Sequence, residues 1–494
     1  MNKEVKEPKQ PNLMHALISF GLLIAIMAVS IIVFGVDVHV PMLCGVIIAA
    51  IVSLCLGYSW SFIEKAMMDG VYNALQAVII LMIVGVLIGV WIVSGVVPAM
   101  IYYGLKLLSP SIFLVAALLI CSVTSIATGT SWGTMGTMGL ALIGIAIGFG
   151  IPAPMAAGAI ISGAYFGDKM TPLSDTTNLA PAMAGTDVIT HIKAMILPTA
   201  IVYVISIVFF LVLGFNYAKT GNAASMDEVN AMSSALKGMF NINPILLLPP
   251  LIIIVAVALK MPAIPGITLG IIAGAILGPI FQGDACSIGS LMDCGMNGFT
   301  CETGNAAIDD LLTSGGITNM LYSVSLTMIA MMFGGIMEAT GQLKVVVSKI
   351  SKLAKTPASL VVTTEATCVL SNITMPEQYI SLVVPGRMYQ QTYKENGLHA
   401  KTLSNALESA GTVTSALVPW NTCGVFILGT LGVATVEYFP YAIFNYLMPI
   451  TVAIMAYLGF CVFDKNGNRV TGKQARSKMP LVTEDAAPEA PAAE

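Results

Sequence analysis

The chain has 494 residues, of which 56% are hydrophobic and only 10% are charged, and its mean hydropathy is +0.87. A soluble protein of this length needs more charge on its surface. Apolar runs of roughly 20 residues, the length of a membrane-spanning helix, recur without strand-like alternation, which excludes an outer-membrane barrel. The net charge of −4 gives no sign of nucleic-acid binding, and four scattered His argue against a metal site or another cofactor. These features exclude a soluble enzyme.

Ten long helices are predicted, five in each half of the chain. Those of the first half cover 13–35, 39–57, 72–100, 111–128 and 189–214. Those of the second half cover 244–260, 262–283, 317–340, 357–374 and 440–464. Shorter stretches, broken by Gly and Pro, lie near 133–166 and 378–433. The run Leu13–Gly35 is too long for a signal peptide and is interpreted as the first transmembrane helix.

The distribution of Lys and Arg predicts the topology. Basic residues in 3–9, 344–355 and 465–478 place both termini and one loop in the cytoplasm, whereas the acidic segment Phe281–Gly316 is expected outside. The series of five helices in the first half then starts from the inside, and the series of five in the second half starts from the outside. The predicted fold is an all-α polytopic membrane protein with two inverted-topology repeats and broken helices or re-entrant hairpins at its centre.

This topology divides the chain into five segments. They are a cytoplasmic segment at 1–12, a first repeat at 13–214, a connecting loop at 215–243, a second repeat at 244–464 and a tail at 465–494. The tail is polar and then Ala/Pro/Glu-rich, a composition that predicts disorder.

The richest polar segment is Ser162–Ala180 in the first half. Carboxylates at membrane depth are costly unless they face a cavity or a partner, and Pro172 is expected to unwind the helix and free its carbonyls. Na⁺ prefers oxygen ligands, and a carboxylate can bind either a cation or a proton, which is the simplest basis for antiport. The alternative is that Asp168 and Lys169 form a charge pair at the membrane surface. The candidate cation- and proton-binding residues here are Asp168, Thr171, Ser174, Asp175, Thr176, Thr177 and Asn178.

The second half repeats this design in Glu408–Gly424, with one carboxylate, several hydroxyls and a Pro break. An ordinary helix cap in the interface is the alternative. The candidate residues are Glu408, Ser409, Asn421 and Thr422, and a sodium ion is predicted at Asp175, Asn178 and Asn421.

Two further polar breaks are candidate unwound points, although surface turns explain them equally well. Their candidate ligands are Thr128, Thr130, Ser131, Asn372 and Glu377. Glu365 lies within an apolar helix and is a candidate for a proton path. The absence of a nucleotide-binding motif argues against ATP-driven transport, and an enzyme is disfavoured because no His is expected within the membrane to act as a base.

The segment Gly163–Ala180 resembles the signature of the NhaC-type sodium/proton antiporters of the ion transporter superfamily. Val418–Gly424 and Glu377–Arg387 are similar to the second-half motifs of that family. The resemblance implies a bacterial inner membrane, an inverted-repeat fold and exchange of sodium for protons, while some relatives couple these ions to lactate and malate. One position departs from the family pattern. In that pattern an acidic residue often follows the position of Glu408, whereas this chain has Ser409 there.

The predicted function is therefore Na⁺/H⁺ antiport. The expected partners are Na⁺, H⁺ and the lipid bilayer, without nucleic acid. A homodimer is the one protein assembly considered. A coupled organic-acid exchanger of the same fold is the first alternative. It requires Arg387 or Lys169 to face the cavity, because a carboxylate substrate needs a cationic group. A channel or a membrane-embedded enzyme is the alternative from another class.

Overall fold

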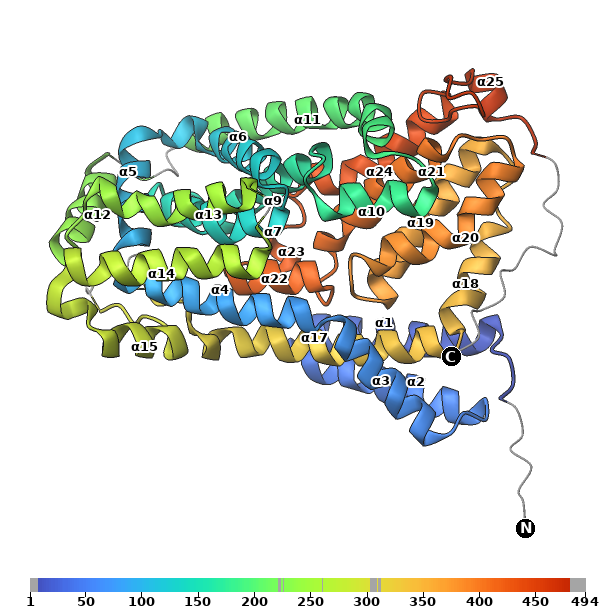
Figure 1. Ribbon diagram of the computed structural model, residues 1–494, viewed down its shortest axis with the longest axis horizontal. Helices are drawn as coiled ribbons and strands as arrows, with labels where there is room; N and C mark the ends of the chain where they lie inside the picture. Colours follow the sequence, from blue (N-terminus) through green and yellow to red (C-terminus); the bar gives the residue numbers. More distant parts are fainter. Residues whose placement is uncertain are drawn as a thin grey trace, which may run out of the picture.

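The computed structural model describes residues 8–220, 224, 226–259, 261–302, 309 and 312–479. These residues are almost entirely helical, with isolated β-bridges, and most helices run along the long axis of the molecule (Figure 1). Seven helices are long and apolar enough to cross a membrane, or up to nine if each of two bent pairs is one span. The described chain begins and ends at the same end of the bundle.

The first half of the chain contains thirteen helical elements within the described residues. They are α1 (Leu13–Ile32), α2 (His39–Cys55), α3 (Trp60–Asn73), α4 (Leu75–Val93), α5 (Val96–Leu107), α6 (Pro110–Thr128), α7 (Ser131–Thr134), the π-helix η1 (Met135–Gly139), α8 (Leu140–Gly148), α9 (Ala153–Met170), α10 (Asp175–Ala184), α11 (Val188–Lys219) and α12 (Met226–Met239).

The second half begins with a short 3₁₀ turn and ends beyond the last long helix. Its described elements are η2 (Pro244–Leu247), α13 (Leu248–Ala258), α14 (Ala263–Gln282), η3 (Gly283–Cys286), α15 (Ile288–Asn297), α17 (Gly316–Ala339), α18 (Gln342–Ser351), α19 (Pro357–Thr374), α20 (Ile380–Glu395), α21 (Ala400–Leu407), the π-helix η4 (Glu408–Thr412), η5 (Ser415–Leu417), α22 (Thr422–Leu431), α23 (Thr435–Tyr438), α24 (Ile443–Tyr457) and α25 (Gly472–Ala475).

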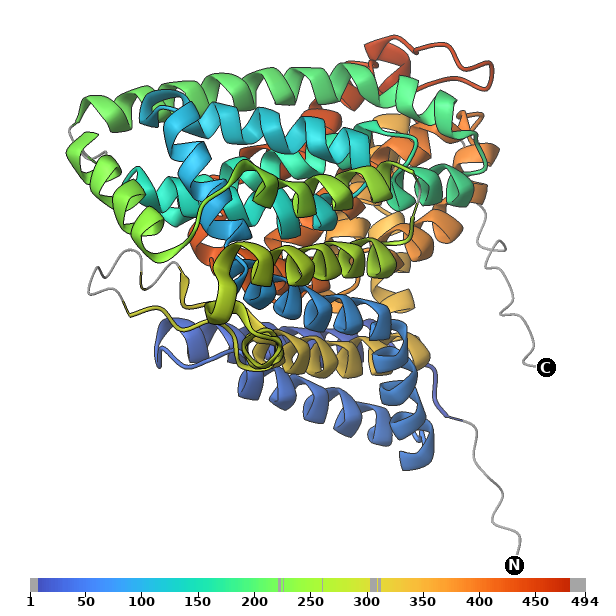
Figure 2. The same ribbon diagram turned by 60° about the vertical axis from the view of Figure 1, so that its left-hand side comes forward.

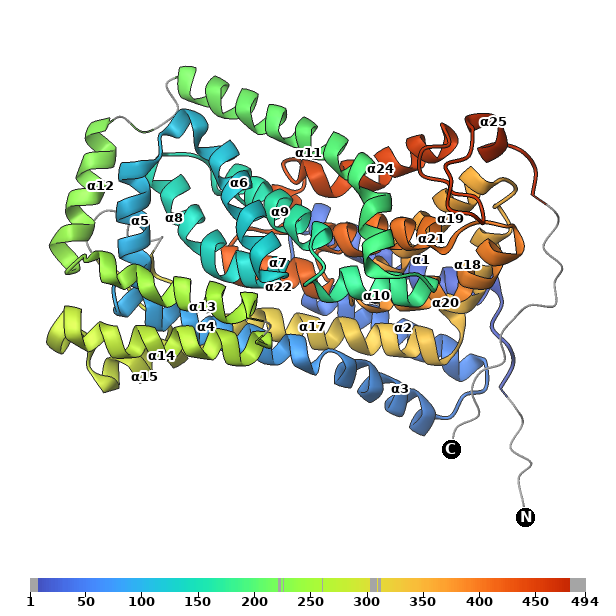
Figure 3. The ribbon, with the colours of Figure 1, turned by 45° about the horizontal axis from the view of Figure 1, so that its top comes forward.

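The helices form two groups. In Figure 2, α1, α2 and α3 (blue) lie with α17 (gold) as one layer along a side of the remaining bundle. Figure 3 shows α10 beside α20 and α21, so that polar segments of the two halves meet in the other group. The segments before and after α17 lie at opposite ends of the bundle, as their acidic and basic composition predicts.

Most predicted long helices are present, but three predictions are wrong. The run 72–100 is not one helix, because the chain bends at Ala74 and again at Ser94–Gly95. The mean hydropathy of the run stays high across both positions and does not register the bends. The connecting loop 215–243 contains α12, whose polar composition concealed a helix with acidic residues in its first turn. The described part of the predicted disordered tail, 465–479, forms a β-bridge and α25. The rest of the tail, 480–494, and residues 1–7 of the N-terminal segment lie outside the described residues.

Small residues hold α9 against α6. A Cβ atom at Gly163 would lie 2.3 Å from the carbonyl oxygen of Leu118, and one at Gly167 would lie 2.6 Å from that of Ser122. This close packing fixes the C-terminal end of α9, which carries Asp168, beside the end of α6.

All four predicted polar breaks are interruptions between helices. They separate α6 from α7, α9 from α10, α19 from α20, and η5 from α22. The first break requires Gly129, whose φ of 73° is left-handed and ends α6 abruptly. Each half also carries one π-helix, a feature frequent at functional sites. The inverted relation of the two halves stays a prediction.

The crossing of α3 and α17 gives a test of the packing. A Cβ at Gly335 would lie 2.1 Å from the carbonyl oxygen of Ala66, so Gly335→Ala forces the two helix backbones apart. We expect it to cost about 1–3 kcal/mol of stability and to lower the melting temperature of the detergent-purified protein. Gly21→Ala in α1 is the matched control, since a Cβ there meets nothing within 4 Å. Equal melting temperatures for the two variants would contradict the packing.

Candidate functional site

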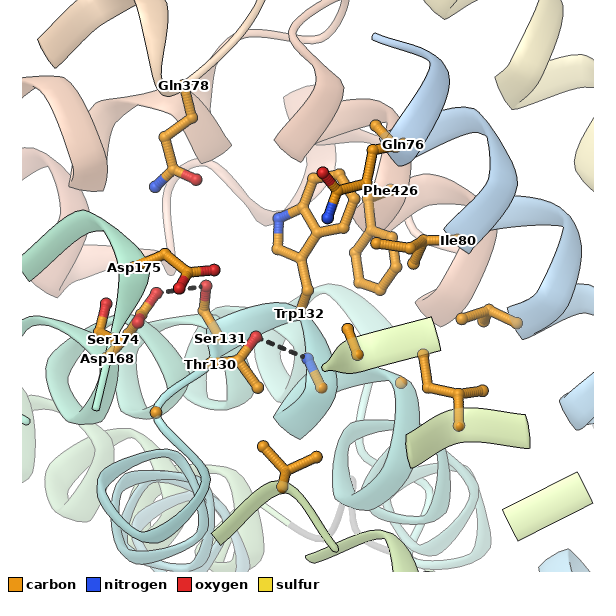
Figure 4. Close-up of a pocket in the computed structure, with 18 of the residues that line it drawn as sticks. Gln76, Ile80, Thr130, Ser131, Trp132, Asp168, Ser174, Asp175, Gln378 and Phe426 are labelled. Atoms are coloured by element: carbon orange, nitrogen blue, oxygen red, sulfur yellow. Dashed lines mark hydrogen bonds between the residues drawn. The ribbon is translucent and has the colours of Figure 1, made fainter. Parts of the chain in front are cut away.

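A cavity of about 150 Å³ lies where the helix breaks approach one another (Figure 4). Residues of both halves line it. In the first half they come from the α3–α4 junction, the α6–α7 break and the start of α10, and in the second half from α13, α14, the start of α20 and α22.

Three carboxylates face the cavity: Asp168, Asp175 and Glu377. Asp168 is only 5% exposed, and the Ser131 hydroxyl donates a 2.7 Å hydrogen bond to its Oδ2 (Figure 4). Glu377 Oε2 accepts hydrogen bonds from the backbone N–H groups of Tyr379 at 2.6 Å and Ile380 at 3.2 Å, which are free because α20 begins there. None of the described residues that line the cavity is Lys, Arg or His.

Asp175 is positioned by the start of α10. Ser174 is the N-cap, and its side chain accepts a hydrogen bond from the backbone N–H of Thr177, so that Asp175 is the first residue of the helix. The helix dipole favours a negative charge in that first turn. Asp175 is also solvent-exposed, in contrast to Asp168. The cavity thus holds one exposed carboxylate, Asp175, and two that are nearly buried, Asp168 and Glu377.

The wall opposite the carboxylates is apolar. Trp132 stacks on Phe426 with ring centroids 4.3 Å apart and an angle of 13° between the ring planes. Aliphatic side chains complete this wall: Ile80, Val84 and Leu87 of α4, Ile253 and Val257 of α13, and Ile267 of α14.

A second polar layer lies behind the cavity and joins the two halves of the chain. The hydroxyl of Thr176, which lines the cavity, donates a 3.2 Å hydrogen bond to Oε1 of Glu408. Glu408 is fully buried in η4, and its Oε2 has no hydrogen-bond partner among the described residues. Thr176 is therefore the polar link between the cavity and a buried carboxylate of the other half.

Lys169 is buried rather than part of a surface charge pair, so that alternative is wrong. Its side chain is 0% exposed, and its Nζ donates a 2.9 Å hydrogen bond to Ser409 Oγ. Ser409 in turn donates to Asn405 Oδ1 at 3.1 Å. No carboxylate of the described residues lies within ion-pair distance of the Lys169 amine, although Glu408 and Glu365 are close enough to act on it electrostatically. The position that departs from the family pattern is thus the one that contacts this lysine.

Several predicted site residues support the backbone and do not line the cavity. The Asn178 amide donates to the carbonyl oxygens of Pro172 and Ser174 and so closes the α9–α10 break. Asn421 caps α22, and its amide donates to the carbonyl oxygen of Asn372. Of the predicted sodium ligands Asp175, Asn178 and Asn421, only Asp175 lines the cavity.

The predicted site residues as a whole divide into those that line the cavity and those that do not. Those on the cavity are Thr130, Ser131, Asp168, Ser174, Asp175, Thr176 and Glu377. Those away from it are Thr128, Thr171, Thr177, Asn178, Glu365, Asn372, Glu408, Ser409, Asn421 and Thr422. Within the part of the chain that the structure describes, no three His, Cys, Asp or Glu side chains are grouped closely enough to hold a metal ion.

The sequence reasoning missed the polar residues that the long helices contribute. Gln76 lines the cavity, and it is the only amide or charged side chain in α4, which was a detectable signal. Asn73, which also lines the cavity, precedes the bend at Ala74. Trp132 and Gln378 lie within two of the polar breaks predicted from the sequence, but neither was predicted as a site residue. Phe426 carried no signal in the sequence.

Comparison with known proteins places the chain in a family. Residues 163–460 match the model of the Na⁺/H⁺ antiporter family. The malate-2H⁺/Na⁺-lactate antiporter of Bacillus subtilis is 38% identical over 95% of this chain and 100% of its own length. The Na⁺/H⁺ antiporter NhaC of Alkalihalophilus pseudofirmus is 36% identical over 92% of this chain and 97% of its own length. The arginine/ornithine antiporter ArcD of Halobacterium salinarum is 34% identical over 93% and 94%.

Solved structures resemble the chain only weakly. The YdaH transporter of Alcanivorax borkumensis gives a TM-score of 0.39 at 13% identity, covering 80% of this chain and 89% of its own. The sequence relatives decide the assignment, because they match almost from end to end. The chain therefore belongs to the Na⁺/H⁺ antiporter family.

Proposed function

We propose that this protein is a secondary active transporter that exchanges Na⁺ for H⁺ across a bacterial inner membrane. One observation carries the proposal. The side chains on the cavity that can carry a charge at neutral pH are carboxylates, and none of the described lining residues is cationic. A carboxylate binds either a proton or a hard cation through its oxygens. Competition between the two for Asp168 and Asp175 couples their movements in opposite directions. The relatives that are named Na⁺/H⁺ antiporters support the same activity.

The orientation belongs to this proposal. The basic residues near α18 and α25 lie at the end of the bundle where the described chain begins and ends. Lys- and Arg-rich segments face the cytoplasm in membrane proteins. This pattern supports cytoplasmic N- and C-termini.

Organic-acid exchange, which one relative carries out by its name, is less well supported by the cavity. An organic anion needs a cationic group or a free helix N-terminus at its binding site. Arg387 is exposed on α20 away from the cavity, and Lys169 is sealed between α9 and η4. The carboxylates that do face the cavity would repel such a substrate.

Asp175→Asn tests the proposed site. It removes the charge of the exposed carboxylate at nearly constant size, so we expect loss of sodium-dependent proton flux in a folded protein. The measurement is dequenching of a pH-sensitive dye by Na⁺ in proteoliposomes, with the melting temperature as the check of folding. Asp227→Asn in α12, an exposed acid away from the cavity, should retain exchange. Full exchange by Asp175→Asn would refute the site.

Thr176→Val tests the link to Glu408. The substitution removes only the hydroxyl that bonds to Glu408 Oε1 and leaves a side chain of the same shape. A hydrogen bond to a charged group contributes about 1.5–3 kcal/mol, so exchange should slow roughly tenfold or more if the link is used. Thr176→Ser keeps the hydroxyl and should restore most of the rate. Equal rates for the Val and Ser variants would show that the link has no part in transport.

The charge of the cavity predicts its response to other ions. In the same dye assay, Na⁺ should drive proton movement, whereas sodium-free lactate and malate salts should not. Arg387→Ala should leave the response to Na⁺ intact, because that side chain does not line the cavity. Proton flux driven by lactate or malate would instead favour the organic-acid exchanger.

A further inference from the structure

The apolar wall of the cavity has no role in binding a bare sodium ion. Ile80, Ile253 and Ile267 present hydrocarbon to the same space as the carboxylates, and each is at least nine-tenths buried. A hard cation is held by oxygen ligands and gains nothing from aliphatic groups. A ligand that uses both walls has a charged head and a hydrocarbon part.

The cavity is also larger than one ion requires. Its volume of about 150 Å³ compares with the roughly 10–15 Å³, on the same measure, that holds one water. The carboxylates of the described residues are not grouped tightly enough to hold a metal ion among three of them. In Figure 4, Asp168 and Asp175 lie together on one flank of Trp132, and Ile80 and Phe426 lie on the other. This spacing suits an elongated ligand better than a point charge.

We propose that the cavity also accepts an organic cation, namely a guanidinium or ammonium group on a short aliphatic chain. The charged head lies against Asp175, the exposed carboxylate, with Asp168 behind it, and a planar guanidinium can form paired hydrogen bonds with the Asp175 carboxylate. The chain lies along the aliphatic wall of α4, α13 and α14, and the Trp132–Phe426 pair borders both parts. The proposal rests on the proposed function, because it takes this cavity as the transport site of a cation/proton exchanger.

The apolar wall makes the proposal quantitative. Each methylene of the ligand that is buried against it should tighten binding about fourfold, until the chain reaches the length of the wall. The head group competes with Na⁺ for the same carboxylates. A ligand held by charge alone would show the competition without the dependence on chain length.

The test is binding of guanidinium, methylguanidinium, propylguanidinium and butylguanidinium to the full-length detergent-purified protein, measured calorimetrically. These cations keep their charge at neutral pH, so they do not cross a bilayer as free bases in the parallel proteoliposome assay. We expect affinity to rise along the series, Na⁺ to displace the ligand, Asp175→Asn to abolish binding, and butylguanidinium to drive proton efflux. Absence of binding, or binding that is indifferent to Na⁺ or to Asp175→Asn, overturns the proposal.

Two isoleucines of α14 provide a matched pair of variants. Ile267 lines the cavity and is 6% exposed, whereas Ile272 is 49% exposed on the outer side of the same helix. Ile267→Ala should flatten the rise of affinity with chain length, and Ile272→Ala should keep it. Ile80→Ala in α4 replaces Ile267→Ala if the latter does not fold, and an unchanged rise in the cavity variant overturns the proposed wall.

The outcomes separate this proposal from the proposed function. If Na⁺ drives proton flux but no guanidinium binds, the organic-cation inference fails and the sodium/proton exchange stands. If neither Na⁺ nor any guanidinium drives proton flux, the proposed function fails as well.

Discussion

A helix that ends inside a membrane leaves N–H and C=O groups without partners, and lipid supplies none. Four breaks between helices occur among the described residues, and the architecture depends on where they lie. The unpaired groups are satisfied by neighbouring side chains, as when Glu377 accepts the first N–H groups of α20 and Asn178 donates to the carbonyls before α10. Three of the four breaks contribute residues to the cavity between the two halves, and the fourth precedes α22, whose Phe426 lines it.

Burial of charge imposes a second constraint behind the first. Asp168, Lys169 and Glu408 are each at least nine-tenths buried, and an ionised group in such a place is costly unless hydrogen bonds replace water. Serine and threonine supply these bonds: Ser131 to Asp168, Ser409 to Lys169 and Thr176 to Glu408. Two of the three bonds join the first half of the chain to the second. The contact between halves is thus polar and incompletely paired.

The sequence predicts this organisation well where composition is decisive. A Pro or Gly among hydroxyl and amide residues within an apolar stretch has few interpretations, and all four breaks identified in this way are real. Charge patterns likewise placed the segments on either side of α17 at opposite ends. By contrast, the bend at Ala74 carries neither Pro nor Gly, and Asn73 and Gln76 beside it are too few to interrupt the apolar run.

Within the motifs, the sequence identifies polar residues but not the direction in which they point. Asp175 and Asn178 are three residues apart at the start of α10, yet one faces the cavity and the other turns back to bond Pro172 and Ser174. Chemical suitability as a ligand was the same for both. Tertiary packing decided which one became free to bind, and only packing placed Phe426 and the α14 wall opposite the carboxylates.

If the cavity is the transport site, as proposed, its two walls control different properties of the cargo. The sign of its charge is set by α9, α10 and the start of α20, where the carboxylates are fixed by helix ends that the fold cannot easily change. Its size is set by α4, α13 and α14, whose apolar side chains make no hydrogen bonds that a substitution would break. Exchange of one aliphatic residue for another costs less than loss of a satisfied buried carboxylate. Substitutions in this fold should consequently alter the shape of the cation more readily than they convert a cation site into an anion site.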